Sequence, residues 1–121
     1  PILGELVDSF VVGCDPKTMG YGPVPAVQGL LKKQGLKLAD IEWIEINEAF
    51  AAQALAVQKE LEIPSEKLNV DGGAIAIGHP LGASGTRLTM HLLYRLKPGS
   101  LGLAAACIGG GQGIAVLVRV P

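Results

Sequence analysis

The chain has 121 residues, with 10 Lys and Arg against 11 Asp and Glu and a net charge of −1. This length fits a single domain, and the balanced charge argues against a nucleic-acid-binding protein, which would need a basic patch. Two cysteines are too few for a secreted disulfide framework and have no metal-ligand spacing with either histidine, so we expect reduced thiols and no metal site.

The chain is short of polar surface for a free-standing domain. Only 17% of its residues are charged and 49% are hydrophobic, which predicts an apolar face that rests against another domain or subunit. Because the sequence starts at Pro1 rather than Met, we expect a piece of a longer protein. No signal peptide or transit-like segment is present, so we expect a cytoplasmic location, with the mitochondrion and the peroxisome left open.

The first half of the chain predicts two strand-helix pairs. Residues 5–12 alternate as a strand, and Pro23 marks the entrance of an amphipathic helix that ends at Gly35. Residues 39–47 alternate as a second strand, which runs almost directly into a helix over 48–62. The first turns of that helix are apolar on nearly every side, so we expect a central, buried helix.

The second half predicts a short strand over 68–70, a glycine-rich loop over 72–82 and a helix over about 84–96. The 18 residues 101–118 carry no charge, a length at which a membrane helix must be considered. Five glycines argue against a membrane span, and the three consecutive ones at 109–111 mark a turn between two buried strands. The order β-α-β-α-β-α-β-β predicts a layered α/β domain, with helices covering a mixed sheet.

Three polar residues fall where ligands bind in such sheets. Asn47 ends one strand and opens a helix, His79 lies in the glycine-rich loop, and Cys107 ends a strand at the triple-glycine turn. The carboxyl ends of strands and the N-termini of helices form the usual ligand-binding edge of an α/β sheet. We therefore expect these three side chains to converge on one pocket.

Each of the three residues also has a purely structural interpretation. Asn47 is a preferred helix N-cap residue. His79 is either a buried turn histidine or a base, held in one direction because Pro80 restricts its backbone. Cys107 is either a small buried hydrophobe or a functional thiol. In the second case, the backbone amides of residues 109–111 lower the pKa of the thiol or bind an oxyanion beside it.

The remaining polar residues indicate less. We interpret His91 as a residue on the face of a helix. The acidic residues Glu42, Glu45 and Glu48 alternate too regularly to form a carboxylate dyad. The GGGQG stretch matches neither a dinucleotide-binding fingerprint nor a P-loop.

Four blocks together resemble the thiolase family, which comprises acetyl-CoA acetyltransferases and 3-ketoacyl-CoA thiolases. In order, they are MGYGPVPA (19–26), NEAFAAQ (47–53), GGAIAIGHPLGASG (72–85) and CIGGGQGIA (107–115). The resemblance covers nearly all of residues 1–121 but only the C-terminal domain of a thiolase. It implies one of two similarly folded halves in a layered α-β-α-β-α core, with the nucleophilic cysteine on the absent N-terminal half.

The resemblance also implies roles for individual residues. His79 is similar to the family's catalytic histidine, which takes the proton of the nucleophilic cysteine, and Cys107 to its acid/base cysteine. Asn47 is similar to the asparagine that holds a water in one oxyanion hole, and the N–H of Gly109 to a donor of the other. Met19 and Phe50 match positions that line the acyl pocket.

The implied function is acyl transfer between an enzyme cysteine and CoA or acetyl-CoA, as Claisen condensation or thiolysis in fatty acid metabolism. The implied partners are CoA and acyl-CoA, the N-terminal half and a second copy in a homodimer or homotetramer, with no cofactor, nucleic acid or membrane. By itself the fragment is expected to be inactive. Two alternatives remain open: a non-catalytic binding or assembly module, and a free-standing hydrolase using Cys107 and His79.

Overall fold

The computed structural model describes residues 2–121. Its strands are β1 (Glu5–Gly13), β2 (Trp43–Ile46), β3 (Leu101–Ile108) and β4 (Gln112–Arg119). Its α-helices are α1 (Pro23–Gln34), α2 (Ala51–Glu60), α3 (Ala74–Ile77) and α4 (Leu81–Arg95), with short 3-10 helices at Pro16–Tyr21, Leu38–Asp40 and Ser65–Lys67.

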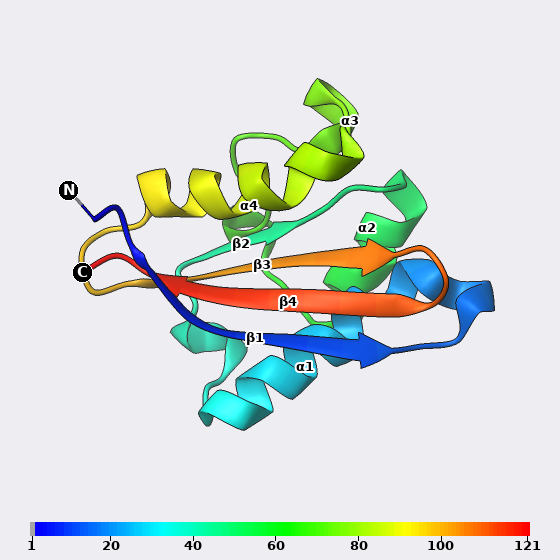
Figure 1. Ribbon diagram of the computed structural model, residues 1–121, viewed down its shortest axis with the longest axis horizontal. Helices are drawn as coiled ribbons and strands as arrows, with labels where there is room; N and C mark the ends of the chain where they lie inside the picture. The colour runs from blue at the N-terminus through cyan, green and yellow to red at the C-terminus, as the bar shows by residue number, and fades with distance from the viewer. Residues whose placement is uncertain (1) are drawn as a thin grey trace.

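The four strands form one mixed sheet in the order β1-β4-β3-β2 (Figure 1). β4 pairs antiparallel with both β1 and β3, while β2 lies parallel to β3. Residues 109–111 join β3 to β4, and Gly110 and Gly111 have φ values of 95° and 96°, which glycine adopts without strain. The sequence prediction of an α/β domain with a mixed sheet is confirmed.

Helices cover both faces of this sheet. Leu103 and Leu117 belong to the core cluster under α1, whereas their neighbours Ala104 and Val118 pack with Leu92 of α4. Because alternate strand residues point to opposite faces, α1 and α4 lie on opposite sides of the sheet (Figure 1). Leu92 is fully buried, which contributes about 1.5–3 kcal/mol for a side chain of this size.

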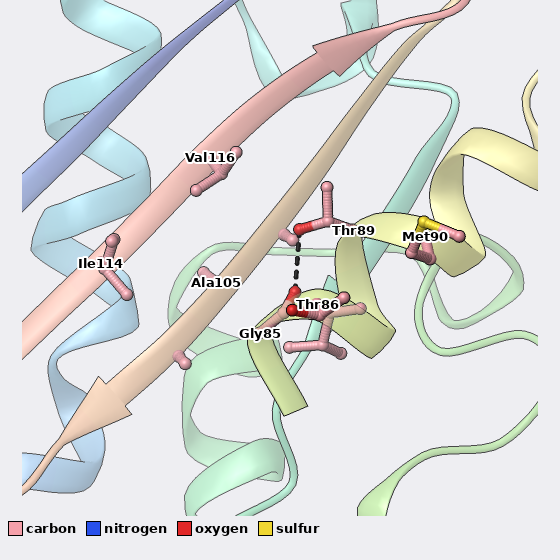
Figure 2. Close-up of a pocket in the computed structure, with 10 residues that line it drawn as sticks. Gly85, Thr86, Thr89, Met90, Ala105, Ile114 and Val116 are labelled. Carbon is pink, nitrogen blue, oxygen red and sulfur yellow. Dashed lines mark hydrogen bonds between the residues drawn. The ribbon is translucent and has the colours of Figure 1, made fainter. Parts of the chain in front are cut away.

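One half of the α4 side of the sheet is left uncovered. An open groove of about 390 Å³ runs beside α4, between Thr89 and Met90 of the helix and Ile114 and Val116 of β4 (Figure 2). Its lining is almost entirely apolar, and Val11 of the neighbouring strand β1 is also exposed. This is the apolar face that the low content of charge predicts.

Three sequence predictions about elements are wrong. Residues 68–70 form no strand, because only Leu68 bridges to Ile44 before Asn69 turns the chain with a φ of 46°. The predicted loop over 72–82 contains a turn of helix, α3. α4 begins at Leu81 rather than near residue 84, with Pro80 as its N-cap residue.

The helix predicted over 48–62 is shorter and less buried than expected. α2 spans Ala51–Glu60 and buries only Gln53 and Val57, while Leu55 is 65% exposed. Its apolar outer side has no covering element among residues 2–121, so the helix lies on the surface of this chain. The sequence pattern therefore identifies the apolar side of α2, but this domain does not bury that side.

Candidate active site

His79 lies between a glycine that allows a sharp turn and a proline that restricts its backbone. Gly78 ends α3 with a φ of 91°, a conformation that favours glycine, and Pro80 begins α4 as the N-cap residue. His79 is exposed and lies between the two helices. The chain can therefore turn sharply in front of the histidine and enter a helix directly behind it.

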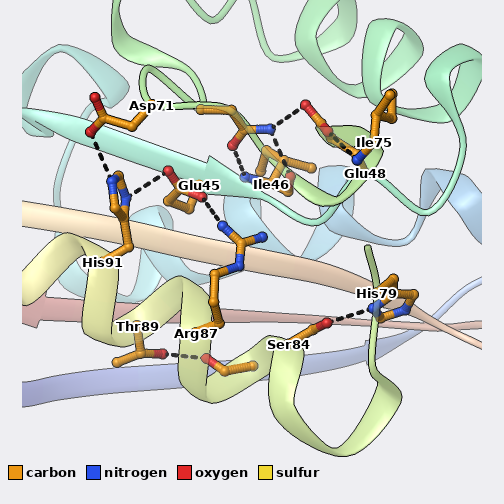
Figure 3. Close-up of polar contacts among 12 residues, drawn as sticks. Glu45, Ile46, Glu48, Asp71, Ile75, His79, Ser84, Arg87, Thr89 and His91 are labelled. Atoms are coloured by element: carbon orange, nitrogen blue, oxygen red, sulfur yellow. Dashed lines mark hydrogen bonds and ion pairs between the residues drawn. The ribbon is translucent and has the colours of Figure 1, made fainter. Parts of the chain in front are cut away.

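Both ring nitrogens of His79 have hydrogen-bond partners. Nδ1 lies 2.6 Å from Oγ of Ser84, as Figure 3 shows, and Nε2 lies 3.3 Å from Nδ2 of Asn47. Ser84 comes from the first turns of α4 and Asn47 from the end of β2. The imidazole thus links the helix to the sheet through neutral side chains.

Asn47 does not cap a helix. Its backbone N–H donates to the carbonyl of Ala105 at 2.9 Å and extends the β2–β3 pairing by one residue, while α2 starts only at Ala51, with Phe50 as its N-cap residue. The capping interpretation and the direct passage from strand to helix are both wrong, because residues 47–50 separate the two elements. Asn47 is 1% exposed, and its Oδ1 has no hydrogen-bond partner among the described residues.

Cys107 lies near the end of β3, beside the end of β2. Burial raises the pKa of its thiol, and the nearby Cys14 raises it further, against a smaller lowering by a backbone hydrogen bond. The expectation that the glycine turn lowers this pKa is wrong, because removal of the thiolate from water outweighs the backbone contribution. One amide of the turn is also already used, since Gly111 donates to the carbonyl of Ile108.

These residues share one pocket. Asn47, His79, Cys107 and Gly109 all line a cavity of about 260 Å³ at the carboxyl ends of β2 and β3. Met19 and Phe50 do not line it: Met19 lies in the 3-10 helix Pro16–Tyr21, and Phe50 is 66% exposed. The predicted convergence of Asn47, His79 and Cys107 on one pocket is therefore confirmed, and Gly109 lines the same pocket.

Sequence reasoning missed a second polar cluster next to this pocket. The Glu45 carboxylate is 1% exposed and lies 3.2 Å from Nη1 of Arg87 and 2.9 Å from Nδ1 of His91, while Nε2 of His91 is hydrogen-bonded to Asp71 at 2.8 Å (Figure 3). The Nδ1 contact has the distance of an ion pair but not the direction of a hydrogen bond. Burial raises the pKa of Glu45 even though His91 and Arg87 act to lower it.

A model of the thiolase C-terminal domain matches residues 1–120. The chain belongs to the thiolase family. Human mitochondrial 3-ketoacyl-CoA thiolase is 56% identical over 119 residues, which cover 97% of this chain and 30% of that protein. The acetyl-CoA acetyltransferase of Escherichia coli K12 is 59% identical over 109 residues, which cover 88% of this chain and 28% of that protein.

Solved thiolase structures share the fold. The human mitochondrial enzyme superposes with a TM-score of 0.96 at 54% identity. The aligned region covers all of the present chain and 31% of the human chain. Peroxisomal 3-ketoacyl-CoA thiolase of Saccharomyces cerevisiae superposes with a TM-score of 0.98 at 45% identity. The aligned region covers all of the present chain and 35% of the yeast chain. This thiolase domain therefore spans only about a third of the length of such relatives.

Within residues 2–121, every helix falls short of the length and apolar character that a membrane span requires. Nor do these residues contain a group of three or more His, Cys, Asp or Glu side chains placed to hold a metal ion.

Proposed function

We propose that this chain supplies the proton-transfer and oxyanion-binding half of a thiolase active site. The reaction is acyl transfer between a cysteine on another segment and CoA or acetyl-CoA, by Claisen condensation or by thiolysis of a 3-ketoacyl-CoA. The observation that carries the proposal is the single pocket lined by Asn47, His79, Cys107 and Gly109 in a thiolase C-terminal domain.

In the thiolysis direction, Nε2 of His79 accepts the proton of the attacking cysteine, and the electron pair stays on its sulfur as a thiolate. The thiolate adds to the 3-keto carbon, and the bond between carbons 2 and 3 then breaks to leave an enolate of acetyl-CoA. Cys107 donates its proton to that enolate carbon. Its raised pKa keeps it in the protonated form that an acid requires.

The oxyanions of the reaction need hydrogen-bond donors in the same pocket. We assign Asn47, through an ordered water, and His79 to the thioester oxygen, and the N–H of Gly109 to the other oxyanion. The buried and unpaired Oδ1 of Asn47 supports this assignment, because such atoms usually have a partner in the working protein. Met19 and Phe50, which lie outside the pocket, are proposed as acyl-chain contacts on its outer side.

The apolar groove beside α4 and the exposed side of α2 support packing against a second, cysteine-bearing half. The yeast peroxisomal relative is described as a five-layered structure built from two core domains of identical topology, and as dimeric. The human relative has been solved in complex with CoA. Our proposal for the full-length protein therefore includes CoA and acyl-CoA as ligands, a homodimer or homotetramer and a role in fatty acid metabolism.

A cytoplasmic location is part of the same proposal. The mitochondrion and the peroxisome are the alternatives, because relatives carry both descriptions. Fractionation of cells that express the full-length protein decides between the three compartments.

The test is cleavage of acetoacetyl-CoA by CoA, followed by the loss of the substrate's absorbance. The full-length protein should be active and the 121-residue chain inactive, and Cys107→Ser in the full-length protein should lower kcat by about 10²- to 10⁴-fold, the usual contribution of an acid/base group. Activity of the short chain alone would favour a free-standing hydrolase. Full activity of Cys107→Ser would favour a non-catalytic module.

A further inference from the structure

We propose that Ser84 is a positioning residue that fixes the tautomer of His79, so that Nε2 is the atom that accepts protons. The consequence for catalysis rests on the proposed function, whereas the tautomer itself rests only on hydrogen-bond geometry. Ser84 is 5% exposed and is the fourth residue of α4.

The hydroxyl of Ser84 has two neighbours and one hydrogen. Oγ lies 3.1 Å from the carbonyl oxygen of Pro80, one helical turn back, and 2.6 Å from Nδ1 of His79. A carbonyl oxygen can only accept, so the single hydrogen of Ser84 is donated to Pro80. Oγ then accepts, and Nδ1 of His79 must carry a hydrogen and donate it.

The other side of the ring agrees with this assignment. With Nδ1 protonated, Nε2 of the neutral imidazole has a free lone pair, and the amide Nδ2 of Asn47 can donate to it across 3.3 Å. The opposite tautomer would place an Nε2–H against the N–H groups of Asn47. In that tautomer Ser84 would have to donate its hydroxyl hydrogen to Nδ1, and its hydrogen bond to the Pro80 carbonyl would be lost. With the Asn47 amide nitrogen toward the ring and the Ser84 hydroxyl donating to Pro80, both ring contacts join a donor to an acceptor only in the Nδ1–H tautomer.

This arrangement prepares His79 for proton transfer. Nε2 faces Asn47, which shares the pocket with Cys107, so the free lone pair is directed toward the site rather than the helix. When Nε2 gains a proton, its contact with Nδ2 of Asn47 is lost, but Nδ1–H keeps its bond to Ser84 and holds the ring in place. Hydrogen-bond partners that orient a metal-bound histidine are typically worth about 10- to 100-fold in metal affinity or activity, and we expect an effect of the same order for His79.

The chain offers two controls for this inference. Thr89, on the same helix, donates its hydroxyl to the carbonyl of Gly85 at 2.9 Å, the same type of bond to the preceding turn, but it has no histidine partner (Figure 3). His91 is the other histidine of the chain. It serves as an internal reference in any measurement of imidazole nitrogens.

The first experiment measures the tautomer directly. Long-range ¹H–¹⁵N spectra of histidine-labelled protein, in which the neutral imidazole is observed, should show Nδ1 of His79 as the protonated nitrogen. Ser84→Ala should lower the fraction of the Nδ1–H form in favour of Nε2–H, Ser84→Thr should restore it, and Thr89→Val should leave it unchanged. His91 should not respond to any of these changes. An Nε2–H form in the unmodified protein, or no response to Ser84→Ala, would overturn the proposal.

Spectra of the full-length protein make the result independent of how well the short chain folds alone, and the loss of a signal in His79→Asn identifies His79. In the same protein, Ser84→Ala should lower kcat for acetoacetyl-CoA cleavage by about 10- to 100-fold, with KM nearly constant and recovery in Ser84→Thr. An unchanged kcat would contradict the positioning role. A full-length protein that is inactive from the start would refute the proposed function while the tautomer measurement still decides the role of Ser84.

Discussion

The two histidines have opposite kinds of surroundings, although each links α4 to the β2 side of the sheet. His91 belongs to α4 and contacts Glu45 of β2, whereas His79 lies two residues before α4 and contacts Ser84 of that helix and Asn47 at the end of β2. His79 contacts the neutral side chains of Ser84 and Asn47, whereas His91 lies between the carboxylates of Glu45 and Asp71. Carboxylate oxygens only accept hydrogen bonds, so His91 donates through Nε2 to Asp71, while its Nδ1 lies at ion-pair distance from Glu45. His79 keeps one nitrogen as an acceptor. A proton-transfer group needs such an acceptor, whereas a histidine that bridges two carboxylates does not.

This difference predicts opposite consequences for the two histidines, and the effect on activity is the largest we expect. His79→Ala in the full-length protein should lower kcat by about 10²- to 10⁴-fold and change stability little, because the residue is exposed. His91→Gln should leave kcat within about threefold but lower the free energy of unfolding by about 1–2 kcal/mol, since buried Glu45 loses its close contact with the imidazole. Steady-state kinetics and urea unfolding of the same two variants measure both quantities. Equal losses of activity would mean that the two clusters work as one unit.

The charged cluster can be broken more directly at Arg87. Arg87→Met removes the guanidinium that lies 3.2 Å from the Glu45 carboxylate, which is 1% exposed, and we expect the free energy of unfolding to fall by about 3 kcal/mol near neutral pH. The matched control is Lys97→Met, because Lys97 is 83% exposed and lies 3.7 Å from Glu42. That change should cost less than about 0.5 kcal/mol.

The pH dependence of Arg87→Met gives the sign of the Glu45 contribution. A carboxyl whose pKa is raised on folding binds more protons in the folded state than in the unfolded state, so stability falls as pH rises above about 4.3, the ordinary value for Glu. Arg87 acts to lower this pKa, so its loss should raise the pKa further and extend the fall in stability to higher pH, and adding Glu45→Gln should remove that extension. Urea unfolding between acidic and neutral pH measures it. A variant whose stability rises over that range would contradict the assignment.

Local sequence patterns identified the pocket but not the network beside it. The bracketing of His79 by Gly78 and Pro80, and the placement of Asn47 and Cys107 at strand ends, are local features that show directly in the sequence. The contact between Glu45 and Arg87 joins residues 42 positions apart, and no local periodicity reports such a pair. The only available signal was an acidic residue inside an otherwise buried strand.

Ser84 was missed for a different reason. Placing the start of the helix near residue 84 makes this serine look like a helix-start residue, whereas the helix begins at Leu81 and carries the Ser84 hydroxyl back toward Pro80 and His79. The burial of α2 was also misjudged, because its apolar pattern describes a side that residues 2–121 leave uncovered. Sequence patterns thus reported which surfaces are apolar, but not which part of the protein covers them.

The smallest effect we expect concerns the alkylation rate of Cys107. It tests whether the surroundings of His79 are neutral, in contrast to those of His91. Burial is the main cause of the raised Cys107 pKa, and His79 is not among the groups that shift it. In the Cys14→Ser chain, Cys107 should react with iodoacetamide severalfold more slowly than free cysteine near neutral pH, because the thiolate is the reactive form, and the rate should rise about tenfold per pH unit below the raised pKa. Adding His79→Asn should leave this profile unchanged. If that variant instead slowed alkylation further at neutral pH, His79 would be acting as a cation beside the thiol, and the contrast with His91 would fail.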